Sequence, residues 1–332
     1  MNYTSLILCI TVSALLSIGL PVALLIFWRK KTHARLFPAV IGAATFVLFA
    51  LVLERLLHSV VLKLPAVTGN TVVYVLYAGF AAGIFEETGR WFAFRFLLKK
   101  YRGRETSVTY GIGHGGIEAI LITGTTMLSN LALAILLATE GEAGLTAIVG
   151  SDTAATLISA YRSTAPGLYL VGGLERVTAI ALHIALSVLV FRAVRERRIG
   201  RWLLAVLFHA LVDCFAVLYS VGVIGNIWVI ELGVFLMTVG IALLALQDYR
   251  VMGETEPPSS DGEEPIYGPE EGPLPEENEQ AYEPEELFPA GEQSAGPEEL
   301  FPTEEASAEE PSAEGPDQDA PSEDSADPEE NA

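Results

Sequence analysis

The fold class is decided by the run Thr71-Val-Val-Tyr-Val-Leu-Tyr-Ala-Gly-Phe-Ala-Ala-Gly-Ile-Phe-Glu-Glu-Thr-Gly-Arg90, continued as Trp-Phe-Ala-Phe-Arg-Phe-Leu-Leu-Lys-Lys100. It offers the roughly 20 residues that a helix needs to cross a bilayer, and it ends in basic residues. It also holds Glu86, Glu87 and Arg90, and each ionisable side chain within a span costs about 2.5–3.5 kcal/mol. We therefore interpret the run as a transmembrane helix that carries part of a functional site.

Similar apolar runs recur along the first 250 residues, which fits a mean hydropathy of +0.41 for the whole chain. Only helices satisfy their own backbone groups in lipid, and no run alternates as a barrel strand does. The sequence therefore predicts an all-α, polytopic transmembrane helical bundle of about seven spans. The expected spans are residues 5–28, 36–62, 71–98, 110–138, 168–191, 202–222 and 224–246.

The basic residues predict how the bundle is oriented. Thirteen Lys and Arg follow the first, third and fifth spans, whereas the alternate loops hold only Lys63 and Arg162. Because basic loops stay in the cytosol, we expect an integral protein of the plasma membrane with its amino terminus outside and its carboxyl terminus in the cytosol. The first span has no basic residues before it, so we interpret it as an uncleaved anchor in the lipid bilayer.

The last 82 residues have a different composition. All 20 Lys and Arg lie at or before Arg250, whereas 28 of the 41 Asp and Glu follow it. Such a segment cannot bury enough apolar surface to fold, so residues 1–250 are expected to form the membrane domain and residues 251–332 a disordered acidic cytosolic tail. The tail repeats Pro-Glu-Glu-Leu-Phe-Pro at 284–289 and 297–302, either as low-complexity sequence or as two docking motifs for a partner. Nothing in the composition favours nucleic acid as a partner.

Four polar residues on different spans are expected at one depth. Counted to the nearest basic residue at the cytosolic end, each lies about 12–15 Å into the membrane at 1.5 Å per residue. They are Glu86, His114, His183 and His209. This shared depth predicts a single intramembrane site in the cytosolic half of the bilayer.

Each of these residues has an ionisable companion on the same helical face. Glu86 and Arg90 are four residues apart, and so are the His-Glu and His-Asp pairs of the fourth and sixth spans. Such companions are expected to orient the site residues. The orienting candidates are Arg90, Glu118, Asp213 and Arg176.

Imidazoles with a carboxylate are typical ligands of a catalytic Zn2+, which leaves a position open for water. The candidate ligands are His114, His209, His183 and Glu87, and the candidate catalytic residues are Glu86, Glu87, His114 and His209. A second glutamate or Asp213 is then available as general base. The sequence lacks a P-loop, a His-Glu-x-x-His motif and a nucleophile elbow.

Each pair also has a purely structural interpretation. The alternative interpretation of Glu86 with Arg90 is a structural intramembrane ion pair, and that of His209 with Asp213 is a structural pair. Glu175 beside Arg176 and the group Glu54, Arg55 and His58 are interpreted as structural pairs of the outer half.

The order Glu86-Glu-x-x-Arg90, Tyr110-x-x-x-His114 and His209-x-x-x-Asp213 resembles the CAAX-protease and bacteriocin-processing superfamily. Within it, Glu-Glu-Thr-Gly-Arg followed by Gly-Ile-Gly-His-Gly-Gly-Ile-Glu-Ala is similar to the YhfC family of intramembrane metalloproteases. The resemblance covers the spans and excludes the tail. It implies that Glu86 or Glu87 acts with His114 on a water, and that His209 and Asp213 bind metal or stabilise the oxyanion. The wider superfamily has three residues between the glutamate pair and the arginine, whereas this chain has two.

These observations predict a zinc-dependent intramembrane endopeptidase. Its partner is expected to be a membrane-embedded or membrane-proximal protein or peptide substrate, cleaved near the cytosolic face. The alternatives are a non-catalytic scaffold of the same fold and a proton- or metal-coupled transporter. A transporter would show two related halves, and no such repeat is evident.

Reporter fusions test the predicted topology. Fusions after Lys31, Arg104, Arg198 and Arg250 are expected to report a cytosolic position, because each follows a span that ends in basic residues. An external position after Arg250 would mean an even number of spans and would remove the shared-depth argument.

Overall fold

The computed structural model describes residues 3–254, and every regular element among them is a helix. Residues 1–2 and 255–332, with both copies of the Pro-Glu-Glu-Leu-Phe-Pro repeat, lie outside the described residues. Six helices are long and apolar enough to cross a membrane, which confirms the predicted polytopic helical bundle. They are Tyr3–Thr32, Phe37–Val61, Glu105–Val149, Pro166–Glu196, Ile199–Ser220 and Ile227–Glu254.

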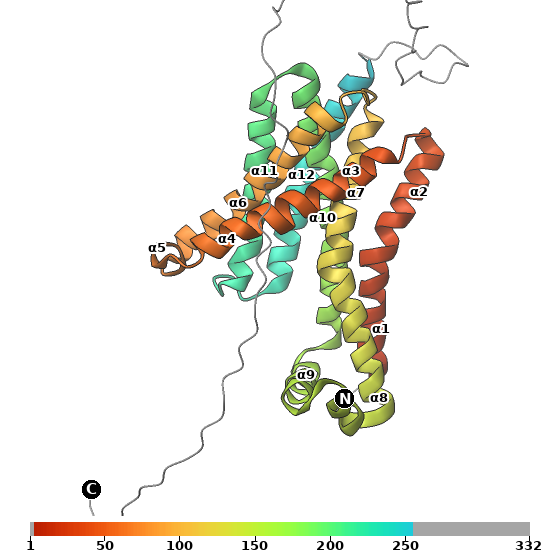
Figure 1. Ribbon diagram of the computed structural model, residues 1–332, viewed down its shortest axis with the longest axis vertical. Coiled ribbons are helices and arrows are strands. Elements are labelled where there is room, and N and C mark those ends of the chain that lie inside the picture. Colours follow the sequence, from red (N-terminus) through yellow and green to blue (C-terminus); the bar gives the residue numbers. More distant parts are fainter. Residues whose placement is uncertain (1–2, 255–332) are drawn as a thin grey trace, which may run out of the picture. The chain divides into compact units, whose positions relative to one another are not determined.

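Several of these helices contain a π-helical stretch, labelled η, in which the backbone bonds skip one extra residue. The bounds are α1 Tyr3–Ala14, η1 Leu15–Gly19, α2 Leu20–Thr32, α3 Phe37–Phe46, η2 Val47–Glu54, α4 Arg55–Val61, α5 Pro65–Thr68, α6 Thr71–Phe92, η3 Ala93–Leu97, α7 Glu105–Glu118, η4 Ala119–Gly124, α8 Thr125–Val149, α9 Ser151–Ser163, α10 Pro166–Glu196, α11 Ile199–Ser220 and α12 Ile227–Glu254 (Figure 1).

Two segments differ from the simplest expectation. The helix α6 is not among the six apolar helices, because Glu86, Glu87 and Arg90 make it more polar than the others. Its role as a seventh span stays a prediction. The helix expected at 110–138 continues to Val149 and bends at Gly141. The φ of Gly141 is 69°, a conformation that glycine adopts readily because it has no side chain.

The basic helix ends lie together. The rings of Trp28 and Tyr249 are 6.4 Å apart, and Arg104 Nη1 donates to the carbonyl of Tyr249 at 3.2 Å. Arg192 and Arg201 both bond Asp248. We call this the basic end, and we call the opposite end, where α10 begins and α11 ends, the far end.

The most deeply buried span is α10, which contacts α1, α7, α11 and α12. In its most apolar window 61% of the residues are buried, against 17–28% in the other five spans. Close approach depends on glycine: a Cβ on Gly111 of α7 would lie 2.6 Å from the Cα of Ile184, and one on Gly83 of α6 would lie 2.8 Å from the carbonyl of Val206. Helices α7 and α10, and likewise α6 and α11, therefore touch through their backbones, which brings their polar side chains together.

Asp248 fastens α12 to its neighbours. This carboxylate is 2% exposed, and its two oxygens bond Arg192 Nη1 and Arg201 Nη1 at 2.5 Å each. Asp248→Asn is expected to lower the free energy of unfolding by about 1–3 kcal/mol, because it leaves buried charge without its partner. Thermal melting in detergent measures the effect. Glu142→Gln is the control, since its pair with Arg162 is exposed and should contribute little. Equal melting temperatures for both variants would contradict this role.

Candidate active site

Helix α6 delivers two carboxylates and a guanidinium to the interior. Asn70 caps its first turn by accepting from the amides of Val72 and Val73. Four turns later Glu86, Glu87 and Arg90 are buried, with exposures of 7%, 0% and 0%. Their arrival inside the protein follows from the contact of α6 with α11, which turns the polar face of α6 away from lipid.

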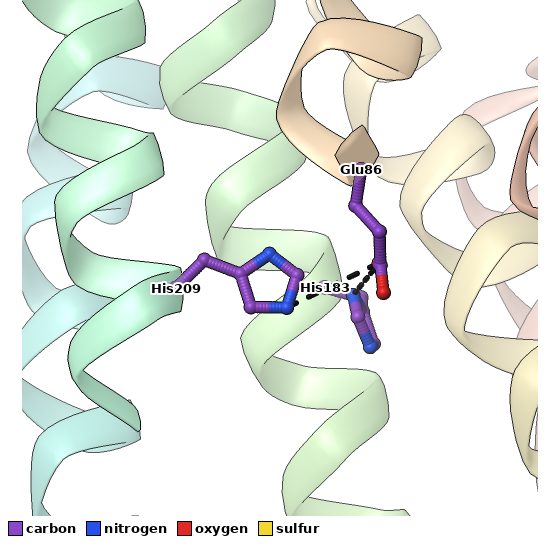
Figure 2. Close-up of side chains that lie close together, drawn as sticks. All are labelled: Glu86, His183 and His209. Carbon is purple, nitrogen blue, oxygen red and sulfur yellow. Dashed lines mark ion pairs between the residues drawn. The ribbon is translucent and has the colours of Figure 1, made fainter. Parts of the chain in front are cut away.

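Three side chains from three helices converge at this level. Figure 2 shows Glu86 of α6, His183 of α10 and His209 of α11 pointing toward one another. Glu86 Oε2 lies 3.9 Å from His183 Nδ1 and 4.0 Å from His209 Nε2. One ligand atom from each residue lies within 4.8 Å of the others, and all three residues are buried. The residues that were expected at one depth are therefore neighbours in space.

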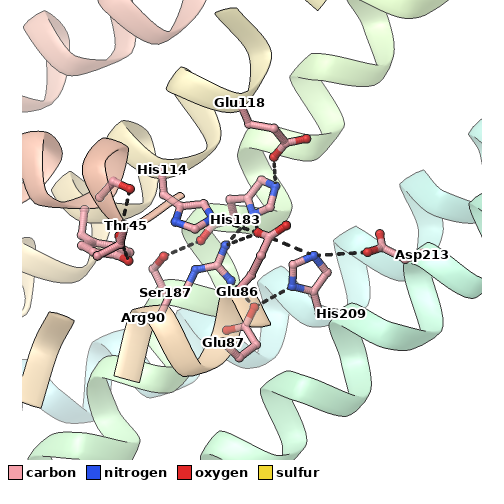
Figure 3. Close-up of polar contacts among 12 residues, drawn as sticks. Thr45, Glu86, Glu87, Arg90, His114, Glu118, His183, Ser187, His209 and Asp213 are labelled. Carbon is pink, nitrogen blue, oxygen red and sulfur yellow. Dashed lines mark hydrogen bonds and ion pairs between the residues drawn. The ribbon is translucent and has the colours of Figure 1, made fainter. Parts of the chain in front are cut away.

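Both histidines of this trio are held from behind by a carboxylate. His209 Nδ1 lies 2.7 Å from Glu87 Oε1, and His183 Nε2 pairs with Glu118 Oε2 (Figure 3). When each ring donates its N–H to that carboxylate, the other ring nitrogen faces Glu86 with its lone pair, which in His183 accepts from Arg90. A carboxylate behind each histidine is a common arrangement in metal sites, where it fixes the tautomer and raises the basicity of the ligand.

The carboxylate of Glu118 is itself anchored. Arg176 Nη1 donates to Glu118 Oε1 at 2.6 Å, and Arg176 Nη2 donates to Glu175 Oε1 at 2.6 Å. Arg176 is therefore linked to His183 through Glu118, and its orienting role, expected from its spacing along α10, stays a prediction. Glu175, with a side chain 42% exposed, lies at the rim of this network.

His114 of α7 adjoins the trio without being part of it. Its Nε2 lies 2.9 Å from Glu86 Oε2, and its ring faces that of His183 at 5.1 Å. Phe46 and Tyr110 hold the ring from the other sides, with centroids 5.2 and 5.8 Å away. In this arrangement His114 fixes the carboxylate of Glu86.

Arg90 supplies the positive charge between the two glutamates. It pairs with Glu87 Oε1, lies 3.7 Å from Glu86 Oε2, and its Nη2 donates to His183 Nδ1 at 2.5 Å. A metal ion held by His183 Nδ1 would compete with Arg90 for the same lone pair.

Asp213 occupies the open side of the site. Its Oδ2 lies 3.5 Å from His209 Nε2, and its side chain is 32% exposed. Glu87, by contrast, is fully buried and occupied by Arg90 and His209. Of the two carboxylates considered as general base, Asp213 is the one that water can reach.

The trio fits a zinc ion in its donors and nearly in its spacing. Zn–N and Zn–O bonds of about 2.0–2.2 Å place the ligand atoms of a tetrahedral site roughly 3.3–3.5 Å apart. The separations of 3.9 and 4.0 Å from Glu86 exceed this by about half an ångström, and all three ligand atoms lie within 4.8 Å of one another, so they would have to move closer together around the ion. Glu86 rather than Glu87 stands in the ligand position, whereas the sequence favoured Glu87 and His114. The latter assignment stays a prediction, as does the catalytic role of each residue.

Sequence reasoning missed Glu54 as part of this neighbourhood. Counting residues from Arg35 along a helix perpendicular to the membrane places it in the outer half. In the structure α3, η2 and α4 run obliquely (Figure 1), and Glu54 is 8% exposed and within electrostatic reach of Glu86 and Asp213. Its Oε1 pairs with His58 Nε2 at 3.3 Å, as expected for a charge pair. The signal available in the sequence was a glutamate directly after the apolar run 47–53, where an ionisable side chain is costly.

The family model for the YhfC intramembrane metalloprotease matches residues 13–234, a stretch that contains every site residue described above. The chain is also 35% identical, over 235 residues, to a protein of Bacillus subtilis (strain 168) named as the uncharacterized membrane protein YhfC. The match covers 69% of this chain and 90% of the relative. No solved structure matches the chain. Placement in the wider CAAX-protease superfamily is compatible with these matches and stays a prediction. The resemblance to YhfC proteins is confirmed, and the chain belongs to the YhfC intramembrane metalloprotease family.

Proposed function

We propose that this protein is a zinc-dependent intramembrane endopeptidase that hydrolyses a peptide bond of a membrane-embedded or membrane-proximal substrate. One observation carries the proposal: Glu86, His183 and His209 meet from three helices, and each histidine has a carboxylate behind it. The family match supports the same reaction class. Membrane burial of such a set is costly, so a set retained at this depth calls for a function.

In the proposed mechanism, Glu86, His183 and His209 would hold a zinc ion. When bound, zinc supplies Lewis-acid chemistry, which polarises a peptide carbonyl and lowers the pKa of water. Asp213 accepts a proton from the attacking water and passes it to the amine that leaves. His114 fixes the carboxylate of Glu86 through its Nε2, at 2.9 Å from Glu86 Oε2.

A specific observation also favours a second candidate, a scaffold without turnover. Arg90 already bonds Glu87 and His183 and lies 3.7 Å from Glu86, so the cluster has a counter-charge from within the chain. A scaffold would therefore be stable without zinc, and its histidine variants would keep their biological function. Metal content distinguishes the two candidates.

Replacing either histidine of the trio is expected to remove both zinc and function. His183→Ala and His209→Ala should each reduce bound zinc from about one per chain to near zero, and the double variant should be no worse, because residues that act as a unit are not additive. Metal analysis of purified protein gives the zinc content. Mapping of new peptide termini in membrane fractions, in cells with wild type or variant, gives the activity.

The matched control is His58→Ala, another intramembrane histidine, which pairs with Glu54 outside the trio. It should keep its zinc. The wild-type protein could instead contain no zinc and still have an activity that depends on Glu86 and His114. In that case the mechanism would use a water activated by these two residues in place of the metal. If the trio variants fold and keep full function, the endopeptidase is excluded and the scaffold is the remaining candidate.

Arg90 is expected to behave differently from the histidines. Arg90→Ala leaves Glu86 and Glu87 without their buried counter-charge, which should lower the free energy of unfolding by about 3–5 kcal/mol. Thermal melting in detergent tests this, with Arg162→Ala as a control at an exposed arginine. A stable Arg90→Ala protein that keeps its zinc but loses activity would instead assign Arg90 to the reaction itself.

A further inference from the structure

A cavity of about 110 Å³ adjoins the trio and lies mainly between α10, α11 and α12. Glu86, His183 and His209 form part of its wall. The space suffices for a few water molecules or one small side chain. The cavity is therefore the candidate route by which water, and a side chain of a substrate, reach the site.

The cavity extends from the trio in one direction only. On α10 its lining residues run from Glu175 to His183, and none follows His183; on α11 they run from His209 to Ala216, and none precedes His209. Because α10 runs toward the basic end and α11 runs away from it, both sets lie on the far side of the trio. On α12 the lining residues lie in the first two turns, which are also at the far end. At 1.5 Å per residue the route is about 10–12 Å long.

The side toward the basic end is closed by packed apolar residues. Leu186, Leu189 and Ala205 are 0% exposed and belong to the hydrophobic cluster that continues from the trio toward the basic end. Trp202 lies at this side too, with its Nε1 donating to the carbonyl of Glu87 at 3.1 Å. A peptide that came from the basic end would have to displace this core.

The wall of the cavity also has a distinct chemistry. Val212, Ala216 and Val234 make it apolar on one part, whereas acidic side chains line the rest. Arg176 is the single Lys or Arg in the wall and pairs with both Glu118 and Glu175. Glu231 of α12 has no hydrogen bond or ion pair within residues 3–254, and Arg176 Nε, which is buried, has no hydrogen-bond acceptor there. The wall thus offers a carboxylate for a cation and an N–H for a carbonyl oxygen.

We propose that substrate reaches the site from the far end, through the cavity between α10, α11 and α12, as a peptide segment whose basic side chain pairs with Glu231. This inference rests on the proposed endopeptidase function. It differs from the expectation of cleavage from the cytosolic side: the bond is hydrolysed at the depth of Glu86, but in the predicted orientation its access is from outside the cell.

Thiol labelling tests the route without any knowledge of the substrate. In a background in which Cys9 and Cys214 are replaced by Ser, Ala216→Cys and Val234→Cys each place a thiol in the cavity wall. Gly225→Cys in the α11–α12 turn marks the far end, Arg198→Cys marks the basic end, and Leu189→Cys lies in the closed core. The probes are two membrane-impermeant methanethiosulfonates, one carrying a trimethylammonium and one a sulfonate group, applied to intact cells and to inverted vesicles.

The cavity cysteines are expected to react from the same side as Gly225→Cys and not from the side of Arg198→Cys, while Leu189→Cys stays unreactive. For each cysteine, the rate with the cationic probe is divided by the rate with the anionic probe. This ratio should be about tenfold higher at Ala216→Cys than at Gly225→Cys, because acidic walls concentrate cations. Glu231→Gln should reduce that preference. Glu142→Gln, an exposed carboxylate outside the cavity, should leave it unchanged.

Reaction of both cavity cysteines from the side of Arg198→Cys, or no reaction while both marker positions react, would overturn the route. Equal rates of the two probes at the cavity cysteines would overturn the proposal that the substrate carries a basic side chain. Because labelling needs neither zinc nor turnover, these outcomes are independent of a failure of the proposed function. Zinc-dependent activity combined with closed cavity cysteines would refute the route alone.

Discussion

The burial of Arg90 between two carboxylates is the constraint on which the site depends. A guanidinium with 0% exposure is costly in an apolar bundle, and only paired charge makes it tolerable. Glu87 forms an ion pair with Arg90, and Glu86 Oε2 lies 3.7 Å from Arg90 Nη2. Since all three side chains come from one face of α6, the helix must turn that face inward, and α7, α10 and α11 bring their histidines to meet it.

From this centre the polar contacts extend outward in pairs. Glu87 orients His209, Glu118 orients His183, and Arg176 in turn holds Glu118. In His183 and His209, therefore, one ring nitrogen is paired with a carboxylate and the other is directed at Glu86. The same low-dielectric surroundings that make these groups costly strengthen the contacts among them, so the network is rigid when satisfied. Such a set of oriented side chains is suited to hold a metal ion.

Much of this was predictable from sequence, because depth in a membrane can be counted. Residue counts to the basic ends placed Glu86, His183 and His209 at one level, and the helices do bring them together. The choice between Glu86 and Glu87 was not predictable, since adjacent residues differ by 100° around a helix and only the packing partners decide which one faces the histidines. Glu54 was set apart from the site because the count assumes an upright helix. Glu231 was overlooked because it has no ionisable companion three or four residues away, and the cavity that it lines is formed only when α10, α11 and α12 pack together.

The central claim is that Glu86, with His183 and His209, holds a divalent metal ion. The most direct test compares the zinc content of purified Glu86→Gln and Glu87→Gln proteins with that of wild type. The two variants make the same chemical change, from a carboxylate to an amide, at neighbouring residues of one helix. Loss of a ligand should reduce bound zinc to near zero in Glu86→Gln, whereas loss of the orienting carboxylate in Glu87→Gln should weaken zinc affinity by about 10–100-fold and leave the site filled at excess zinc. Full zinc in Glu86→Gln with none in Glu87→Gln would contradict the account.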